Sequence, residues 1–340
     1  MVPTPFVFFP PFCQTLESAR HMSYASDNEL FFDPAVHRRV LASEIDVPCQ
    51  RPSFSLPLDR VGIAAKTLWV RLPQGRVPFT ADITVSLTGR RRGIHMSRIE
   101  EEVTRLAGQT FADPAAYAKE LCLRVAAAQE ARRSEVDLRG LLPVERTGRV
   151  SGQRSQDSLV AAARCRFEDG GLTCERQVGV YHITACPCTQ VYTEGAIGQG
   201  LPGGCPYPSH SQRSLTTLAL GSREDVAVGF DDLAAVLGEA LHLVHDLLKR
   251  PDEAELVLAC HQHPQFAEDV VRQVALACGR RFSGVLAPDT TIRIESRSQE
   301  SIHIHDVVCA LSTSLGGICQ QMAATASGNA PAVGPAEGER

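Results

Sequence analysis

The order in which strand-like and helix-like patterns follow one another constrains the fold of this chain more than any other feature. Alternating apolar and polar residues, typical of strands, give way to two helical patterns and then return. Much the same order is repeated in the second half, although the two halves share little sequence. We therefore predict an α+β fold with an internal structural duplication, in which antiparallel sheets carry paired helices on one face.

The first half begins with a hairpin and two helices. Pro73-Gln74-Gly75 is a turn between two alternating runs. Ser97 is a candidate N-cap, with Glu100 completing a capping box, and Asp113-Pro114 marks the start of the next helix. The expected elements are strands at 62–72 and 77–87, helices from 97 and from 113 to about 131, and strands at 135–143 and 158–167.

The second half begins after a turn at Asp169-Gly170-Gly171. Asp231-Asp232 opens a helix whose apolar residues keep helical spacing as far as Leu248, and Gly279 is expected to stop the helix after it. The expected elements are strands at 172–184 and 214–220, helices at 231–248 and 264–278, and strands at 290–296 and 301–311.

Three parts are expected along the chain. Residues 1–45 show no sustained periodicity and are interpreted as an N-terminal extension. The body covers residues 46–322, with a first unit of about 46–170 and a second of about 171–322. Residues 323–340 are rich in Ala, Gly and Pro, which predicts a disordered tail.

Composition narrows the functional classes. The formal net charge is −5, so no basic surface argues for nucleic acid, and no apolar run is long enough to span a bilayer. The twelve cysteines lie in apolar segments without the paired spacing of a secreted disulfide scaffold. We therefore expect a cytoplasmic protein in which most cysteines are small buried apolar residues.

The segment Ile183-Thr184-Ala185-Cys186-Pro187-Cys188 ends an alternating, apolar run. Pro187 favours extended backbone at Cys186, and residues two apart on a strand share a face, so both thiols are expected to point into one space. Cys-x-Cys alone favours a structural or redox role, and no second pair completes a four-thiolate zinc site. A mixed site of one Cys, one or two His and a carboxylate fits better, with His210, beyond the Gly/Pro-rich loop 189–209, as a candidate ligand.

Further titratable residues cluster near the C-terminus. Glu300-Ser301-Ile302-His303-Ile304-His305 is expected on a strand, with both imidazoles on one face. Two imidazoles beside a carboxylate suit metal ligation or proton transfer, whereas two surface histidines on an edge strand are the plainer interpretation. Glu253 and Glu268 lie at expected helix ends, where composition alone leaves them as capping charges. His242 and His245 lie three apart in a helical pattern and are expected to be structural.

Seven segments, in order along the chain, carry a resemblance to a known family. They are Val61-Gly62-Ile63-Ala64-Ala65-Lys66, Gly93-Ile94-His95-Met96-Ser97-Arg98, Cys186-Pro187-Cys188, Ser209-His210-Ser211-Gln212-Arg213, Leu247-Leu248-Lys249-Arg250-Pro251-Asp252-Glu253, Phe266-Ala267-Glu268-Asp269-Val270-Val271-Arg272 and Glu300-Ser301-Ile302-His303-Ile304-His305. Together they resemble the prokaryotic type IB GTP cyclohydrolase I enzymes, whose archaeal relatives make a cyclic-phosphate product. The resemblance covers about residues 46–320, and the segment from Cys186 to His210 is longer than is usual in the family.

The resemblance implies a bimodular tunnelling fold of two ββααββ units per chain, assembled into a homotetramer with active sites at subunit interfaces. It implies GTP as the substrate and a divalent metal ion as the cofactor, and the charge and apolar runs noted above lead us to expect neither nucleic acid nor a membrane as a partner. The implied metal ligands are Cys186, His210, Glu253 and His303. This mixed donor set leaves Zn²⁺, Mn²⁺ and Fe²⁺ open.

The resemblance also implies roles in the reaction. Cys186 would be catalytic as well as a ligand, Cys188 and His305 would take part in catalysis with acid–base chemistry, and Glu268 would accept hydrogen bonds from the guanine edge. The other implied substrate contacts are Lys66, His95, Ser97, Arg98, Arg213 and Glu300. The implied reaction converts GTP and water to formate and 7,8-dihydroneopterin triphosphate, in pterin, folate or deazapurine biosynthesis. Two alternatives stay open: a related enzyme that forms a cyclic phosphate, and a catalytically silent assembly protein that binds GTP.

Overall fold

The structure is a computed structural model and describes residues 31–43, 45–198, 200–223 and 228–327. The chain divides into two units, residues 1–46 and residues 47–340. In the first unit, α1 (Pro34–Leu41) begins after Asp33, whose carboxylate accepts a hydrogen bond of 2.6 Å from the Ala35 N–H. This helix is therefore capped by its own sequence.

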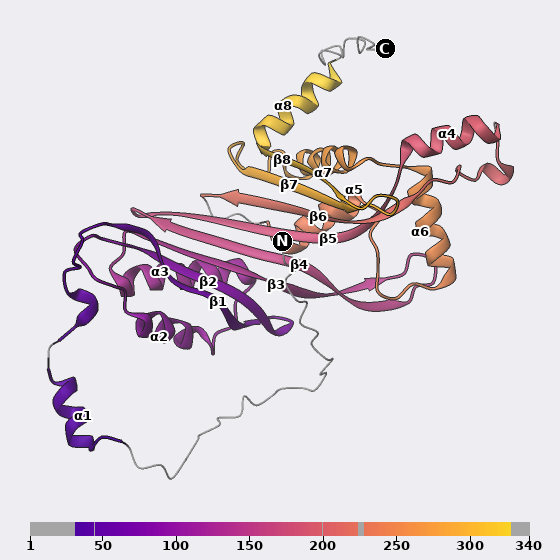
Figure 1. The fold of residues 1–340 in the computed structure, drawn as a ribbon. Helices are drawn as coiled ribbons and strands as arrows, with labels where there is room; N and C mark the ends of the chain where they lie inside the picture. Colours follow the sequence, from indigo (N-terminus) through magenta and orange to yellow (C-terminus); the bar gives the residue numbers. More distant parts are fainter. Residues whose placement is uncertain (1–30, 44, 199, 224–227, 328–340) are drawn as a thin grey trace. The chain divides into compact units, whose positions relative to one another are not determined.

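The second unit is built on one antiparallel sheet (Figure 1). Within the described residues, each of eight strands pairs with the next one in the sequence. The strands are β1 (Leu58–Leu72), β2 (Gly75–Leu87), β3 (Arg133–Thr147), β4 (Arg154–Glu168), β5 (Gly171–Ala185), β6 (Ser211–Ser222), β7 (Thr291–Gln299) and β8 (Asp306–Ser314). The helices of this unit are η1 (Val47–Cys49), α2 (Met96–Leu106), α3 (Pro114–Gln129), α4 (Pro187–Ile197), η2 (Pro202–Gly204), α5 (Phe230–Ala240), α6 (Arg250–Gln262), α7 (Ala267–Phe282) and α8 (Leu315–Ala326).

The expected duplication is confirmed. The order β1-β2-α2-α3-β3-β4 is followed by β5-β6-α5-α7-β7-β8, with α4 and α6 added in the second half. A tight turn at Asp169-Gly170, where φ is 48° and 87°, joins β4 to β5, so the two halves share one continuous sheet. The α+β class is therefore confirmed, with a single sheet where several were expected.

Alternation along the strands places the core between the sheet and the helices. On β2, buried and more exposed residues alternate. Helix α3 packs against β3 and β4, and α7 packs against β7 and β8 (Figure 1). The side chains of Phe79, Leu138, Leu218 and Ile292 are at most 1 % exposed, so the core runs through both halves.

The helices of the first half begin where capping and tertiary contacts place them. Asp113 caps α3 as expected, because its carboxylate accepts a 2.7 Å hydrogen bond from the Ala116 N–H. The expected cap at Ser97 is wrong, since α2 begins at Met96 and Ser97 lies in its first turn. The start of α2 is held from outside the helix: the His95 N–H donates to the Gln129 side chain (3.1 Å), and the Gln129 amide donates to the His95 carbonyl (2.7 Å).

The helix expected at 231–248 is shorter and ends at Ala240. Beyond it the chain lies along β5, where the Ile183 N–H donates to the His242 carbonyl (3.0 Å). Because β4 pairs with β5 only as far as Gly179, the rest of that edge of β5 has backbone groups that need partners. Pairing with this edge therefore outweighs the helical spacing of the leucines.

The segment Lys249-Arg250-Pro251, expected at a helix end, instead starts α6. Proline suits the first turn of a helix, where its missing N–H would have no partner. The Asp252 carboxylate is 3 % exposed and accepts hydrogen bonds from the N–H groups of Lys249 (3.2 Å), Val150 (2.8 Å) and Ser151 (3.0 Å). Asp252 thus fastens the start of α6 to the turn between β3 and β4.

The expected stop at Gly279 is wrong, since α7 continues to Phe282. An added Cβ at Gly279 would come within 2.3 Å of Met322 Sδ and 2.9 Å of Ile318 Cγ2, both in α8. The glycine therefore allows two helices to pack closely and does not end one.

The expected terminal segments are only partly described. Residues 1–30 of the expected extension and residues 328–340 of the expected tail lie outside the described residues. Helix α8 continues to Ala326, past the expected start of the tail at 323. No helix in the described ranges combines the length and the apolar character needed to cross a bilayer.

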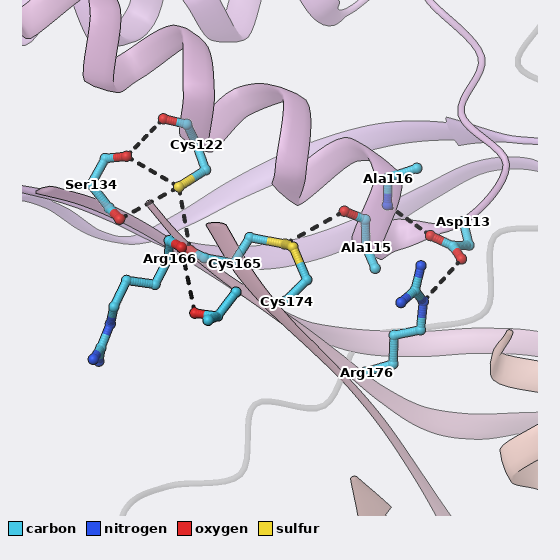
Figure 2. Close-up of a disulfide and its surroundings, with 10 residues drawn as sticks. Asp113, Ala115, Ala116, Cys122, Ser134, Cys165, Arg166, Cys174 and Arg176 are labelled. Carbon is cyan, nitrogen blue, oxygen red and sulfur yellow. Dashed lines mark hydrogen bonds and ion pairs between the residues drawn. A yellow bond between two sulfur atoms is a disulfide. The ribbon is translucent and has the colours of Figure 1, made fainter. Parts of the chain in front are cut away.

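A disulfide joins the two halves where they meet (Figure 2). Cys165 of β4 and Cys174 of β5 are directly opposite in the strand register, with Cα atoms 4.2 Å apart. This pair was not among the expectations from sequence, because the two cysteines become adjacent only once the turn between β4 and β5 sets the register. The expectation of buried, free cysteines is correct for Cys122, Cys260 and Cys278.

Candidate active site

Three strand ends meet at one end of the sheet and carry several of the residues expected to act in chemistry. Ala185, the last residue of β5, pairs with Ser211, the first residue of β6, and the last residue of β7 pairs with the third residue of β6. The residues that adjoin these ends are Cys186, His210 and Glu300. Antiparallel pairing therefore brings together side chains that are far apart in the sequence.

Cys186 is held against the segment that contains His210. The Cys186 N–H donates to the His210 carbonyl (3.1 Å), and the Ser209 hydroxyl donates to the Cys186 carbonyl (2.6 Å). The Thr189 hydroxyl also donates to Cys186 Sγ, at 3.7 Å. The sulfur of this half-buried residue is thus held by a side chain from the first turn of α4.

Cys188 lies in a different local structure. The expected extended backbone from Cys186 to Cys188 is wrong, because Pro187 is the first residue of α4 and Cys188 lies in its first turn, exposed. The loop expected at 189–209 accordingly contains α4 and the short η2.

The imidazole of His210 is oriented by its neighbour. Its Nδ1 lies 3.1 Å from Gln212 Oε1, which can only accept, so Nδ1 carries the proton and Nε2 keeps a lone pair. This is the arrangement that second-shell groups impose on metal-binding histidines. Arg213, one position further along β6, is exposed, with its guanidinium carbon 5.3 Å from the centroid of the Tyr181 ring.

Two residues that the sequence analysis missed support this segment. The Gln190 side chain donates to the carbonyls of Tyr207 (3.0 Å) and His261 (2.6 Å). The His261 ring lies between two carbonyls, with Nδ1 2.8 Å from the Val257 oxygen and Nε2 3.1 Å from the Ser209 oxygen. Gln190 and His261 belong to α4 and α6, and no spacing in the sequence indicates that these helices meet beside His210.

Glu268 lies in the first turn of α7, and the segment that leads into this helix is bonded to the sheet at the end of β5. The Gln265 N–H donates to the Ala185 carbonyl (3.2 Å), which places the first turn of α7 beside the end of β5. Glu268 lines a groove of about 850 Å³ between α7, β8 and α8, together with Arg272 and Cys309. Burial raises the pKa of the Cys309 thiol, and the negative charge of Glu268 raises it further.

The segment 301–305 is a turn between β7 and β8, which corrects the expected strand. Ile304 is fully exposed, so no burial favours an extended segment here. The rings of His303 and His305 stack with centroids 5.2 Å apart and are exposed. Glu300 accepts a hydrogen bond of 2.9 Å from Ser298, which is 3 % exposed and fixes the carboxylate.

Glu253 lies apart from this group in a single chain. It is exposed in the first turn of α6, eight residues before His261, which corresponds to roughly 12 Å of helix. Within the described part of the chain, no three of the four expected ligands, Cys186, His210, Glu253 and His303, have ligand atoms that all lie within 4.8 Å of one another.

The residues of the first half that were expected to contact the substrate form a second group. The Lys66 ammonium pairs with Glu100 at 2.9 Å, which links β1 to α2. Arg98 donates to the Ala128 carbonyl (3.1 Å) at the end of α3, and His95 is bound by Gln129 as described above. Ser97 is exposed beside them.

The two groups lie towards opposite ends of the sheet. His95, Ser97 and Arg98 lie where β2 ends and β3 begins, the same end as the start of β5, whereas Cys186 follows the end of β5. The length of β5 between these ends is roughly 45 Å, far longer than a nucleotide. One chain by itself therefore does not bring both groups to one small molecule.

A family model described as type I GTP cyclohydrolase folE2 matches residues 45–309. The chain belongs to this family of GTP cyclohydrolases. All seven segments that carried the resemblance lie inside the matched residues, so the expected resemblance is confirmed. The two ββααββ halves are the bimodular tunnelling arrangement that the resemblance implied.

Two archaeal enzymes are among the curated relatives of this GTP cyclohydrolase. GTP cyclohydrolase MptA of Methanosphaera stadtmanae is 25% identical over 305 residues, which is 81% of this chain and 97% of the relative. GTP cyclohydrolase MptA of Methanococcoides burtonii is 29% identical over 303 residues, covering 80% and 95%. Among solved structures, a uricase from Bacillus fastidious shares 8% identity with a TM-score of 0.47, covering 78% of this chain and 96% of the uricase.

Proposed function

We propose that the protein is a metal-dependent GTP cyclohydrolase that converts GTP and water to formate and 7,8-dihydroneopterin triphosphate. Membership of the family makes it a hydrolase that acts on GTP as a cyclohydrolase. The observation that carries the finer proposal is the contact between Cys186 and His210, with the His210 imidazole oriented by Gln212. A half-buried thiol and an oriented imidazole on residues whose backbones are hydrogen-bonded are a suitable start for a metal site.

The donors present fit a divalent ion. Cys186 has a hydrogen-bond donor on its sulfur, and His210 has a lone pair free at Nε2. With Glu253 and His303 they would hold Zn²⁺, Mn²⁺ or Fe²⁺, since thiolate, imidazole and carboxylate donors together do not select one metal sharply. When bound, such an ion lowers the pKa of water to near neutrality.

A second copy of the chain would complete the site. In one chain Glu253 lies about two helical turns from His261, and the group around His95 lies at the other end of the sheet. We therefore propose a homo-oligomer, a tetramer by the family resemblance, in which neighbouring copies contribute residues to each site.

The other residues have proposed roles that follow from their chemistry. The Glu268 carboxylate, at one end of its groove, would accept hydrogen bonds from the guanine ring N–H and amino group. Cys188, Cys186 and His305 would act in catalysis, with Cys188 and His305 moving protons. The remaining contacts to substrate and phosphates would come from Lys66, His95, Ser97, Arg98, Arg213 and Glu300.

A second product deserves a separate arm of the test. The curated relatives described above are archaeal enzymes named MptA, and the family resemblance associates archaeal members with a cyclic phosphate. In either case the first step would be the same opening of the guanine ring, in a cytoplasmic pathway to pterins, folate or deazapurines.

The test is an anaerobic assay of the purified protein with GTP and each of Zn²⁺, Mn²⁺ and Fe²⁺. We expect stoichiometric formate and a product whose mass retains all three phosphates. A product mass of a cyclic monophosphate would support the alternative enzyme. GTP binding without formate release under every metal would contradict both and favour a non-catalytic binding protein.

A further inference from the structure

The sheet face that the helices cover changes character near Cys186. Along most of β5, β6 and β7 this face carries apolar residues such as Val178, Leu218 and Ile294, each at most 1 % exposed. Towards the site the same face carries His182, Thr184, Ser214, Thr216, Ser296 and Ser298, and none of these is more than 3 % exposed. A buried layer of six polar side chains therefore lies directly beneath the candidate active site.

Three members of this layer form a hydrogen-bond chain across three strands. His182 Nε2 lies 2.8 Å from Thr216 Oγ1, and the Thr216 hydroxyl donates to Ser296 Oγ at 2.9 Å. Each strand then leads to one candidate site residue: β5 to Cys186, β6 back to His210, and β7 to Glu300. The chain of side chains thus crosses the sheet just below the point where these residues emerge.

The direction of the bonds fixes the form of the imidazole. Thr216 has one hydroxyl hydrogen, which it donates to Ser296, so it can only accept from His182. His182 therefore carries its proton on Nε2, and its buried Nδ1 has no hydrogen-bond partner among the described residues. Burial, together with the nearby His242, lowers the pKa of His182 to about 4, so the ring is neutral at neutral pH.

The fold itself does not require polar groups at this depth. In the first half, the equivalent hairpin places Val70 opposite Val77 and Leu68 opposite Phe79 on the same face. Burying polar groups is unfavourable unless they are bonded, and bonded networks give a core one defined arrangement. The position of this network beneath Cys186 therefore points to a role in the geometry of the site.

We propose that His182, Thr216 and Ser296 are positioning residues that fix the relative placement of the ends of β5, β6 and β7, and so of Cys186, His210 and Glu300. This inference rests on the proposed function, because it assigns the network to the same metal site. Beyond Gly179 the segment 242–244 pairs with β5 in place of β4, and the network ties the same part of β5 to β6 and β7 through side chains.

The test replaces Thr216 by valine, which keeps the shape and removes both hydrogen bonds. The matched control is Thr290→Val: Thr290 is also buried, at 2 % exposed, but its hydroxyl has no partner among the described residues, and it lies at the other end of β7. Zn²⁺ binding is measured by chelator competition, alongside kcat and KM for GTP. We expect Thr216→Val to weaken Zn²⁺ binding about tenfold or more and lower kcat, Thr216→Ser to restore both, and Thr290→Val to leave both unchanged.

A readout on the unmodified protein covers the case in which Thr216→Val does not fold. In ¹⁵N NMR of the imidazoles at neutral pH, His182 should show a protonated Nε2 and an unprotonated Nδ1. A charged ring or the opposite tautomer would overturn the proposal, and so would Zn²⁺ binding equal in Thr216→Val and Thr290→Val. If the unmodified protein binds Zn²⁺ but releases no formate, the proposed function fails while the positioning role stands or falls on the Zn²⁺ comparison alone.

Discussion

The two halves of the chain repeat one architecture but end their first hairpins differently. In the first half, β1 and β2 are joined by Pro73-Gln74 alone. In the second half, β5 and β6 are joined by residues 186–210, which include α4, η2 and both Cys186 and His210. Beneath the first hairpin the helix-covered face is apolar, whereas beneath the second it is polar and buried.

This difference shows how a duplicated fold separates stability from chemistry. A tight turn over buried apolar residues leaves this end of the first hairpin as part of the core. The insertion in the second hairpin lies over buried polar side chains, at positions where the first half has buried apolar ones. The comparison predicts that equivalent substitutions have unequal consequences in the two halves.

The largest effect is expected at the second hairpin. Cys186→Ala should abolish formate release from GTP and reduce bound metal, because it removes the thiol of a proposed metal ligand whose backbone is bonded to that of His210. Gln74→Ala, in the equivalent exposed turn of the first half, should leave both unchanged. Circular dichroism controls for folding, and a fully active Cys186→Ala would remove the distinction between the two hairpins.

The next effect concerns stability in the first half. Phe79 is 1 % exposed beneath the first hairpin, and Phe79→Ala should lower the free energy of unfolding by about 3–5 kcal/mol through lost burial and a cavity. Thr80→Ala, at its exposed neighbour, should cost less than about 1 kcal/mol. Urea denaturation measures both, and equal losses would contradict the assignment of this face to the core.

Two glycines test helix packing in the second half. Gly279→Ala in α7 should destabilise by about 1–3 kcal/mol, because its Cβ would meet Met322 and Ile318 of α8. Gly238→Ala in α5 meets only Leu243 Cδ1, at 3.6 Å, so it should stabilise by about 0.5–1 kcal/mol. Thermal melting of the two variants should show a lower melting temperature for Gly279→Ala and a higher one for Gly238→Ala. Changes of the same sign would contradict the described packing of α8.

The smallest effect concerns the contact between the halves at the start of α6. Hydrogen bonds from the Ser151 hydroxyl and from the N–H groups of Ser151, Val150 and Lys249 hold the pKa of Asp252 well below its ordinary value of 3.8. A lowered folded-state pKa contributes stability that is present above about pH 4 and is lost as the pH falls below it.

Melting temperature as a function of pH tests this contact. The unmodified protein should lose stability more steeply below about pH 4 than Asp252→Asn does, since the amide cannot titrate. Asp246→Asn is the control, because the described contacts of Asp246 are made by its backbone N–H rather than by its carboxylate. If the melting temperatures of all three proteins fall equally steeply below about pH 4, Asp252 does not contribute to the pH dependence of stability.

Much of the fold was predictable because local signals agree with it. The turns at Pro73-Gln74 and at Asp169-Gly170 and the cap at Asp113 all lie where the sequence places them. The failures share one cause, which is that a tertiary partner outweighed a local pattern. Residues after Ala240 leave the helix to pair with β5, and Gly279 serves the packing of α8.

The candidate site was predictable in part and for different reasons. His210 was expected near Cys186 because the two are close in the sequence across a Gly/Pro-rich loop, and pairing of β5 with β6 brings their backbones together. Gln190 and His261 were missed, because contacts between α4 and α6 leave no periodic trace in the sequence. The expected convergence of Glu253 with Cys186 stays a prediction that one chain does not test.

The sequence by itself determined the strand and helix order, the duplication and the residue types available for chemistry, because periodicity and turn residues act locally. Only the tertiary structure decided which of those residues meet. Strand register brought Cys186 to His210, joined Cys165 to Cys174, and buried the polar chain from His182 to Ser296. Register depends on pairing between distant segments, and no single segment contains that information.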